Sequence, residues 1–235
     1  MEHDPLFDGP LPVEVQPLRE IGVNGSESAM VAMCEQGTDE WLKLRKGIVT
    51  ASSASAVVTS LGQPTKGKGR ETYLCKLVGG LLLKHRQEES VSSQAIDRGH
   101  YLEPKARAAY ELATGSEVRQ VGFVWRDETK QAGCSPDGLL PDLGLEIKCP
   151  MQENAVRYLI KGKVPTDYIV QIQFSMWVTG LPCWDFCSYH NDSGIPIFIK
   201  AAEPDEKLHA AFNEHIPAFM AEVTETAERL KERAA

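Results

Sequence analysis

The chain has 235 residues, with 33 acidic residues against 25 lysines and arginines and a formal net charge of −8. This length suits one domain with a sizeable core, and the acidic balance excludes a broadly basic nucleic-acid binder, so phosphate contacts would come from local clusters. No apolar run approaches a membrane span, residues 1–20 lack a signal-peptide pattern, and the six cysteines form no CxxC pair. We therefore expect a cytoplasmic protein with reduced thiols and no membrane contact.

Residues 1–36 contain several prolines and glycines and no sustained period, which predicts an extended arm that is at best partly ordered. A single domain is expected from residue 37 to residue 235. It opens with a helix capped by Thr38 and running to Arg45, because acidic residues follow the threonine in the first turn.

A second helix is expected to begin near Ser52, after a short β-branched run. Hydroxyl groups at the start of a helix form a ready site for an anion, and Arg45 is close in sequence. The alternative is an ordinary helix cap beside a surface arginine. These residues alone leave both interpretations open.

The rest of the chain alternates helical and strand-like segments after a basic loop at residues 62–70. Helices are predicted over residues 71–86, 93–113, 154–160, 165–180 and 206–233. Strands are predicted over residues 117–125, 131–135, 143–149, 183–189 and 195–201. Helices on both sides of a strand cluster indicate an α/β fold with a central mixed β-sheet flanked by helices.

A functional hypothesis rests on residues 133–150, which read GCSPDGLLPDLGLEIKCP. Side chains alternate along a strand, so Glu146 and Lys148 share one face while Ile147 points to the other. If the two strands that flank the Pro-Asp-Gly turn pair as antiparallel neighbours, Asp137 lies beside Glu146. Pro-Asp, eight intervening residues and Glu-Ile-Lys match the metal-nuclease pattern PD-(D/E)XK.

This pattern suits phosphodiester hydrolysis at a metal ion. Mg²⁺ prefers oxygen ligands, which Asp137, Glu146 and the backbone carbonyl of Ile147 would supply. The cation would lower the pKa of Lys148, which could then orient or deprotonate a metal-bound water. Asp-Gly is also ordinary in turns and Glu-x-Lys on solvated strands, so a structural role is the alternative.

Two helical residues are further candidates. Glu103 lies one turn from Gly99 and directly before Pro104, where the helix could bend. Gln171 leaves the apolar stripe of its helix and could face a cleft, whereas Tyr168 lies on the stripe and is expected on the core side. A solvated helix face is the ordinary explanation for Glu103 alone.

Several blocks of the chain follow one another in the order of a known family. These blocks are residues 35–41, 43–45, 50–52, 99–103, 106–107, 134–139, 144–146, 148–150 and 171–179. Through them the chain resembles, over about residues 35–223, the phage lambda exonuclease family of viral recombinases, alkaline exonucleases of the PD-(D/E)XK superfamily. The resemblance implies a restriction-endonuclease-like core.

The resemblance also implies an activity and an assembly. Such enzymes processively digest the 5′-terminated strand of linear double-stranded DNA to 5′-mononucleotides and leave a 3′ overhang for a single-strand annealing protein. The resemblance implies Mg²⁺ as cofactor, two ions per active site and Mn²⁺ as an alternative. It further implies a homotrimeric ring in the cytoplasm of a bacterial host, encoded by a phage or prophage.

The family's functional residues are carried over by motif position. Asp137, Glu146 and the Ile147 carbonyl would be metal ligands, Lys148 would serve the attacking water, and Glu103 and Gln171 would complete the active site. The residues that would hold the 5′-phosphate are Arg45, Ser52 and Ser135. Ile96 would act as a wedge that separates the terminal base pairs, or else belong to the core.

The chain departs from the family pattern in two places. The arm before Glu35 is longer, and the stretch between Lys148 and Gln171 is slightly shorter, which leaves partner identity and strand separation open. A related metal endonuclease or junction resolvase, and a non-catalytic DNA-end-binding protein, are the competing hypotheses.

Overall fold

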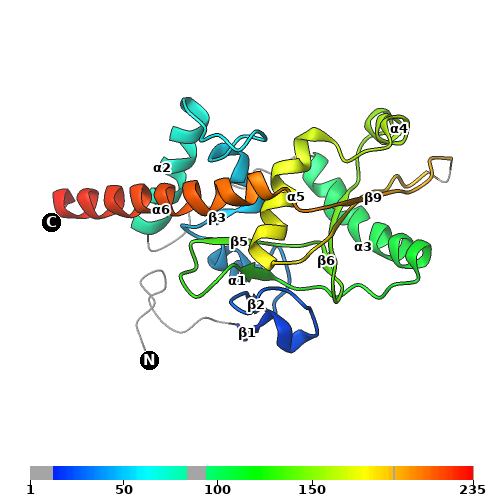
Figure 1. Cartoon of the computed structure of the whole chain (residues 1–235), viewed down its shortest axis with the longest axis horizontal. Coiled ribbons are helices and arrows are strands. Elements are labelled where there is room, and N and C mark those ends of the chain that lie inside the picture. Colours follow the sequence, from blue (N-terminus) through cyan, green and yellow to red (C-terminus); the bar gives the residue numbers. More distant parts are fainter. Residues whose placement is uncertain (1–12, 84–93, 193, 235) are drawn as a thin grey trace.

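The structure is a computed structural model that describes residues 13–83, 94–192 and 194–234. Its strands form two mixed sheets with helices packed around them (Figure 1). The five-stranded sheet has the order β1 (Val15–Pro17), β2 (Met30–Ala32), β4 (Phe123–Trp125), β5 (Ala132–Cys134), β3 (Val49–Thr50). The four-stranded sheet has the order β6 (Gly138–Leu139), β7 (Gly144–Lys148), β8 (Trp184–Ser188), β9 (Phe198–Ala202).

Helices and strands are interspersed along the chain, and the helices pack around the mixed sheets, which confirms the α/β class. The α-helices are α1 (Asp39–Leu44), α2 (Lys68–Leu82), α3 (Gln94–Thr114), α4 (Gln152–Lys161), α5 (Thr166–Thr179) and α6 (Glu206–Ala234). Two 3₁₀ helices are η1 (Leu18–Ile21) and η2 (Ala51–Ala56). No helix in the described ranges combines the length and apolar character that a membrane crossing requires.

Helix α5 is the centre of the core. It packs against β4 and β5 of one sheet and against β7 and β8 of the other, and Figure 1 shows it in yellow near the middle of the molecule. Nearly all of its residues from Val170 onwards are buried, as expected for a helix with neighbours on several sides. Phe174 connects it to α6, with its ring 5.2 Å from that of Phe212.

The segment before residue 37 differs from the predicted arm wherever the structure describes it. Strand β2 pairs in antiparallel fashion with β4, and Val31 lies opposite Val124. Leu18, Ala29 and Val31 have no exposed surface. These elements have only three or four residues each, too few to show a period in the sequence. Residues 13–36 are therefore part of the folded body.

The predicted pairing of the two strands around the Pro-Asp-Gly turn is wrong. Strand β5 has β3 on one edge and β4 on the other, so it has no edge left for β7. The antiparallel partner of β7 is instead the two-residue strand β6, with Gly138 opposite Leu145 and Leu139 opposite Gly144. Asp137 reaches the same neighbourhood because it directly precedes β6.

Several boundaries also differ from the predictions. The helix expected at Ser52 is the 3₁₀ helix η2, whose N-cap is Thr50 without a side-chain hydrogen bond. Helix α2 begins at Lys68, inside the predicted basic loop. Helix α3 continues through Pro104. The strand predicted over residues 117–125 is confirmed only as β4.

Candidate active site

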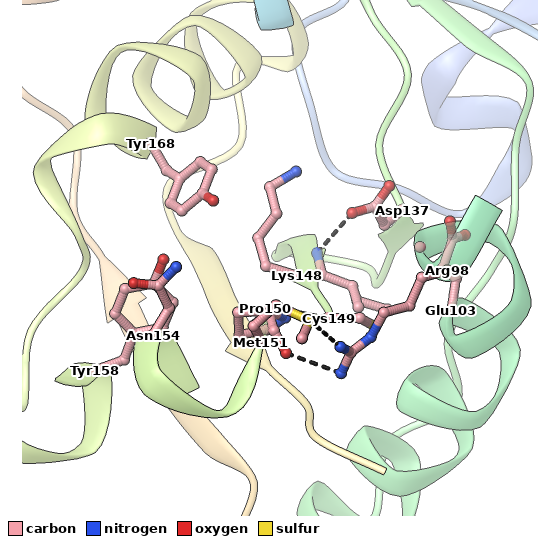
Figure 2. A pocket seen from close by; sticks show the side chains of 12 residues that line it. Arg98, Glu103, Asp137, Lys148, Cys149, Pro150, Met151, Asn154, Tyr158 and Tyr168 are labelled. Atoms are coloured by element: carbon pink, nitrogen blue, oxygen red, sulfur yellow. Dashed lines mark hydrogen bonds between the residues drawn. The ribbon is translucent and has the colours of Figure 1, made fainter. Parts of the chain in front are cut away.

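Asp137 is held against the end of strand β7 by two backbone contacts. Its Oδ2 accepts a hydrogen bond from the Ile147 N–H at 2.6 Å, and its own N–H donates to the Leu145 carbonyl at 3.2 Å. Figure 2 shows the carboxylate pointing toward this backbone. The short pairing of β6 with β7 ends before Ile147, which leaves that part of the strand edge to the Asp137 side chain.

The two faces of β7 have different environments, as the alternation predicts. Leu145 and Ile147 pack in an apolar cluster with Ala106 and Tyr110 of α3. On the other face, the Glu146 side chain is only 3% exposed. Its Oε1 accepts hydrogen bonds from Lys148 Nζ and from Gln171 Nε2, the latter at 2.6 Å. The structure therefore brings Gln171 from α5 to the motif, as the sequence predicts.

Burial and neighbouring charges shift the pKa values of Asp137 and Lys148. Burial, and in addition the charge of Glu146, raises the pKa of Asp137 well above its usual value. Burial alone would lower the pKa of Lys148, but Glu146 and Asp137 outweigh it and raise that pKa. The predicted lowering of the Lys148 pKa presupposes a bound cation, which would act on both groups in the opposite direction.

These oxygen ligands fit a hard divalent cation. Burial, and in addition the charge of Glu146, keeps the Asp137 pKa high, and a positive charge beside the two carboxylates would lower it. The Ile147 N–H points to Asp137, and the N–H and C=O of one strand residue point to the same side, so its carbonyl also faces that side. The described residues contain no metal-binding group of three or more His, Cys, Asp or Glu. Mg²⁺ commonly needs only one or two carboxylates, with water and substrate phosphate as further ligands.

Glu103 is connected to the motif through Arg107. No functional role is predicted for this arginine from the sequence. Arg107 Nη2 donates to Glu103 Oε1 at 2.6 Å, and Arg107 Nε donates to the Asp137 carbonyl at 3.2 Å. The arginine is 9% exposed and lies one helical turn beyond Glu103. It therefore sets the positions of the helical carboxylate and the Asp137 backbone together.

Two of the predicted phosphate-binding residues are in direct contact. Arg45 Nη1 and Trp41 Nε1 both donate to Ser135 Oγ at 2.9 Å, and the Arg45 guanidinium lies 4.1 Å from the Trp41 ring centroid. We call Trp41, Arg45 and Ser135 the arginine–serine cluster. Ser135 of this cluster precedes Asp137 by two residues, which places the cluster next to the motif.

Of the two remaining predicted site residues, Ser52 and Ile96, the structure describes the side chain of Ser52 only. The parallel register of β3 and β5 places Thr50 opposite Gly133, so Ser52 and Ser135 each follow two residues beyond, where the strands end. Ser52 is exposed at the second position of η2. The side chain of Ile96 lies outside the described part of the chain, and its predicted role as a wedge stays a prediction.

A cavity of about 460 Å³ opens beside Asp137 and Lys148. Its wall is formed by residues from α3, the end of β7, α4 and α5 (Figure 2). Those not proposed from the sequence include Arg98, Cys149, Met151, Asn154, Tyr158 and Tyr168.

Tyr168 packs against the core as predicted, with its ring 5.4 Å from that of the buried Phe186. It also lines the cavity, which the sequence does not predict, and Lys148 Nζ lies 5.2 Å from its ring centroid. Its spacing of three residues from Gln171 is the signal that could have found it, because residues three apart share a helix face.

Residues 40–182, more than half of the chain, match the model of the YqaJ-like viral recombinase domain. The chain belongs to the YqaJ-like viral recombinase family. This viral recombinase domain covers the residues of the motif, the arginine–serine cluster and the cavity.

Solved structures agree with the family. This YqaJ-like recombinase is similar to the crystal structure of the alkaline exonuclease LHK-Exo from Laribacter hongkongensis, with 34% identity and a TM-score of 0.75. The match covers 84% of this chain and 98% of LHK-Exo, and a complex of LHK-Exo with dAMP matches at 35% identity, the same TM-score and the same coverage. The expected restriction-endonuclease-like fold and the resemblance to viral recombinase exonucleases are confirmed.

Two more distant relatives agree. A phage-related exonuclease from Haemophilus somnus 129PT is 14% identical with a TM-score of 0.57, covering 82% of this chain and 98% of that one, and shows the fold alone. The uncharacterised protein ExoD of Escherichia coli K12 is 32% identical over 65 residues, which are 26% of this chain and 72% of ExoD.

Proposed function

We propose that this YqaJ-like viral recombinase is a Mg²⁺-dependent exonuclease that digests the 5′-phosphorylated strand of linear double-stranded DNA. It releases 5′-mononucleotides and leaves a 3′ single-stranded overhang. The observation that carries the proposal is the meeting of Asp137, Glu146 and Lys148 at the end of β7, beside the arginine–serine cluster. The similarity to LHK-Exo, described as an alkaline exonuclease, supports the same reading.

Each residue of the motif has a distinct part in this proposal. Asp137, Glu146 and the Ile147 carbonyl would hold Mg²⁺ or Mn²⁺, two ions per active site, which when bound activate water and stabilise charge on phosphate. Lys148 donates hydrogen bonds on the same strand face and would orient or deprotonate the attacking water. Gln171 holds the Glu146 carboxylate in place, and Arg107 holds Glu103.

The arginine–serine cluster supports the preference for a 5′-phosphate. Arg45 offers a guanidinium fork beside the hydroxyl of Ser135, a combination suited to a terminal phosphate. Ser52 would add a second hydroxyl from the neighbouring strand end. With a terminal phosphate here, the first phosphodiester of the same strand would lie at Asp137, two residues along the chain.

A homotrimeric ring would explain processive digestion by an acidic protein. The net charge is −8, so general electrostatic attraction does not retain DNA, whereas a closed ring around the duplex would. A single-strand annealing protein that receives the 3′ overhang is the natural partner, in the cytoplasm of a bacterial host carrying the phage or prophage.

The test is digestion of linear duplexes that carry 5′-phosphate or 5′-hydroxyl ends, with Mg²⁺, by the wild type and by Lys148→Ala. We expect faster loss of the phosphorylated strand, no loss with the variant, and intact closed circles. Cleavage of closed circles would identify an endonuclease instead. Equal rates on both ends would remove the phosphate role of Arg45 and Ser52, and an unaffected Lys148→Ala would exclude this active site.

A further inference from the structure

The cavity beside the motif and the arginine–serine cluster are built from different residues. Trp41, Arg45 and Ser135 do not line the cavity. Its wall runs from Asp137 and Lys148 to the turn after β7 and on to α4. If a 5′-phosphate occupies the cluster and the first linkage lies at the motif, the cavity is where the same strand would continue.

Arg98 of α3 reaches into the wall of this cavity. Its Nη2 donates to the Pro150 carbonyl at 3.1 Å, and its Nη1 contacts the sulfur of Met151. Figure 2 shows the side chain extending from α3 to this turn. A guanidinium has five N–H donors in a rigid fork, so two such contacts fix its position and leave donors for a ligand.

The charge of Arg98 is the unusual feature of the cavity. Two other cations of the active site pair with carboxylates, Lys148 with Glu146 and Arg107 with Glu103. Within the described residues, no carboxylate forms an ion pair with Arg98. A half-buried guanidinium that pairs with no carboxylate among the described residues is suited to a phosphate diester, which accepts two hydrogen bonds in the geometry of the fork.

We propose that Arg98 binds the phosphodiester that follows the scissile bond in the strand being degraded. The inference rests on the proposed function, because it takes the direction of the strand from the arginine–serine cluster to the motif. Arg98 is then a substrate-positioning residue that holds the second linkage while the first lies at Asp137. Tyr168, which is half-buried in the same wall, gives the adjoining nucleoside an aromatic surface.

The experiment is a binding cycle that does not depend on hydrolysis. The ligands are DNA hairpins with one duplex end and a 5′-phosphate, carrying a single uncharged methylphosphonate at the second or at the sixth linkage. Dissociation constants are measured by fluorescence anisotropy in EDTA for the wild type, Arg98→Gln and Arg157→Gln. Arg157 is a matched control, since it lies on α4 outside the cavity wall and pairs with Glu153.

We expect the wild type to bind about ten- to a hundredfold more weakly when the second linkage is uncharged, the range for a charged hydrogen bond. Arg98→Gln should weaken binding of the unmodified hairpin by the same factor. The variant should bind the hairpin with the uncharged second linkage no more weakly than it binds the unmodified one. The sixth linkage and Arg157→Gln should show no such coupling. Arg98→Lys, which keeps the charge, should retain part of the sensitivity and serves as the test if Arg98→Gln does not fold.

If Arg98→Gln and the uncharged second linkage weaken binding by independent factors that multiply, the inference is overturned. Arg98 would then act only by tying α3 to the turn after β7. The outcome is separable from that of the proposed function. Coupling in a protein without nuclease activity would refute the function and leave the Arg98 contact standing. Hydrolysis without coupling would support the proposed function and refute the Arg98 contact.

Discussion

The ionised Asp137 carboxylate, buried beside Glu146, lowers the stability of the metal-free fold. A bound cation would remove this destabilisation. Burial and the neighbouring charge raise the Asp137 pKa, so the folded protein keeps a proton that the unfolded chain has already released. Stability of the metal-free protein should therefore fall as the pH rises from the ordinary carboxyl range to the raised pKa. Sites of this kind sacrifice stability for binding.

Replacing the charge tests this directly. We expect Asp137→Asn to raise the Tm of the metal-free protein at neutral pH, by about 2–4 °C for each kcal/mol recovered. Excess Mg²⁺ should stabilise the wild type by ligand linkage and leave the variant unchanged. Thermal melts with EDTA or Mg²⁺ measure both effects, and equal stabilisation of the two proteins by Mg²⁺ would contradict the assignment.

Arg107 offers a second test at the level of single residues. Arg107→Met removes the bonds to Glu103 and to the Asp137 carbonyl. We expect kcat to fall about tenfold or more with little change in KM, and the free energy of unfolding to fall by about 1–3 kcal/mol.

The control is Arg157→Met, whose exposed pair with Glu153 should contribute about 0.5 kcal/mol or less. Steady-state kinetics and denaturant unfolding provide the measurements. An unchanged kcat in Arg107→Met would mean that the arginine has no positioning role.

At the scale of elements, β2 and β7 differ in how much the sequence reveals. Strand β7 alternates apolar and charged side chains from Leu145 to Lys148, so its faces could be predicted. Strand β2 has three residues and gains its place only by pairing with β4, which lies about ninety residues later in the chain. The segment before residue 37 was therefore predicted to be an arm.

A substitution in β2 distinguishes the folded body from an arm. Val31 has no exposed surface, so Val31→Asp would bury a charge without a partner. We expect a loss of about 3 kcal/mol or more in the free energy of unfolding, or failure to fold. Glu27→Gln, in an exposed ion pair of the same segment, should change stability by about 0.5 kcal/mol or less. Equal and small effects would support the arm.

For the whole molecule, the net charge of −8 means that general electrostatic attraction would not retain DNA between cleavage steps. A ring predicts a particle of about three times the 25.9 kDa chain mass, measured by light scattering. It also predicts that salt slows association, while the length digested after one binding event, measured with an excess of competitor DNA, changes little. A monomer whose processivity falls steeply with salt would exclude the ring.

Local rules in the sequence determined much of the candidate site. Strand alternation placed Glu146 and Lys148 on one face, helix periodicity turned Gln171 out of its apolar stripe, and Thr38 caps α1 as predicted, with its hydroxyl accepting from Trp41 N–H. Each of these features depends on residues only a few positions apart. The order of the sequence blocks was also enough to indicate the family.

Only the tertiary structure decided the rest. Both edges of β5 are taken by strands from other parts of the chain, so Asp137 meets β7 through β6 and not by the predicted pairing. The cavity that includes Arg98 and Tyr168 is built from α3, β7, α4 and α5 together. Which segments become neighbours depends on burial of the whole core around α5, a collective quantity that no local pattern contains.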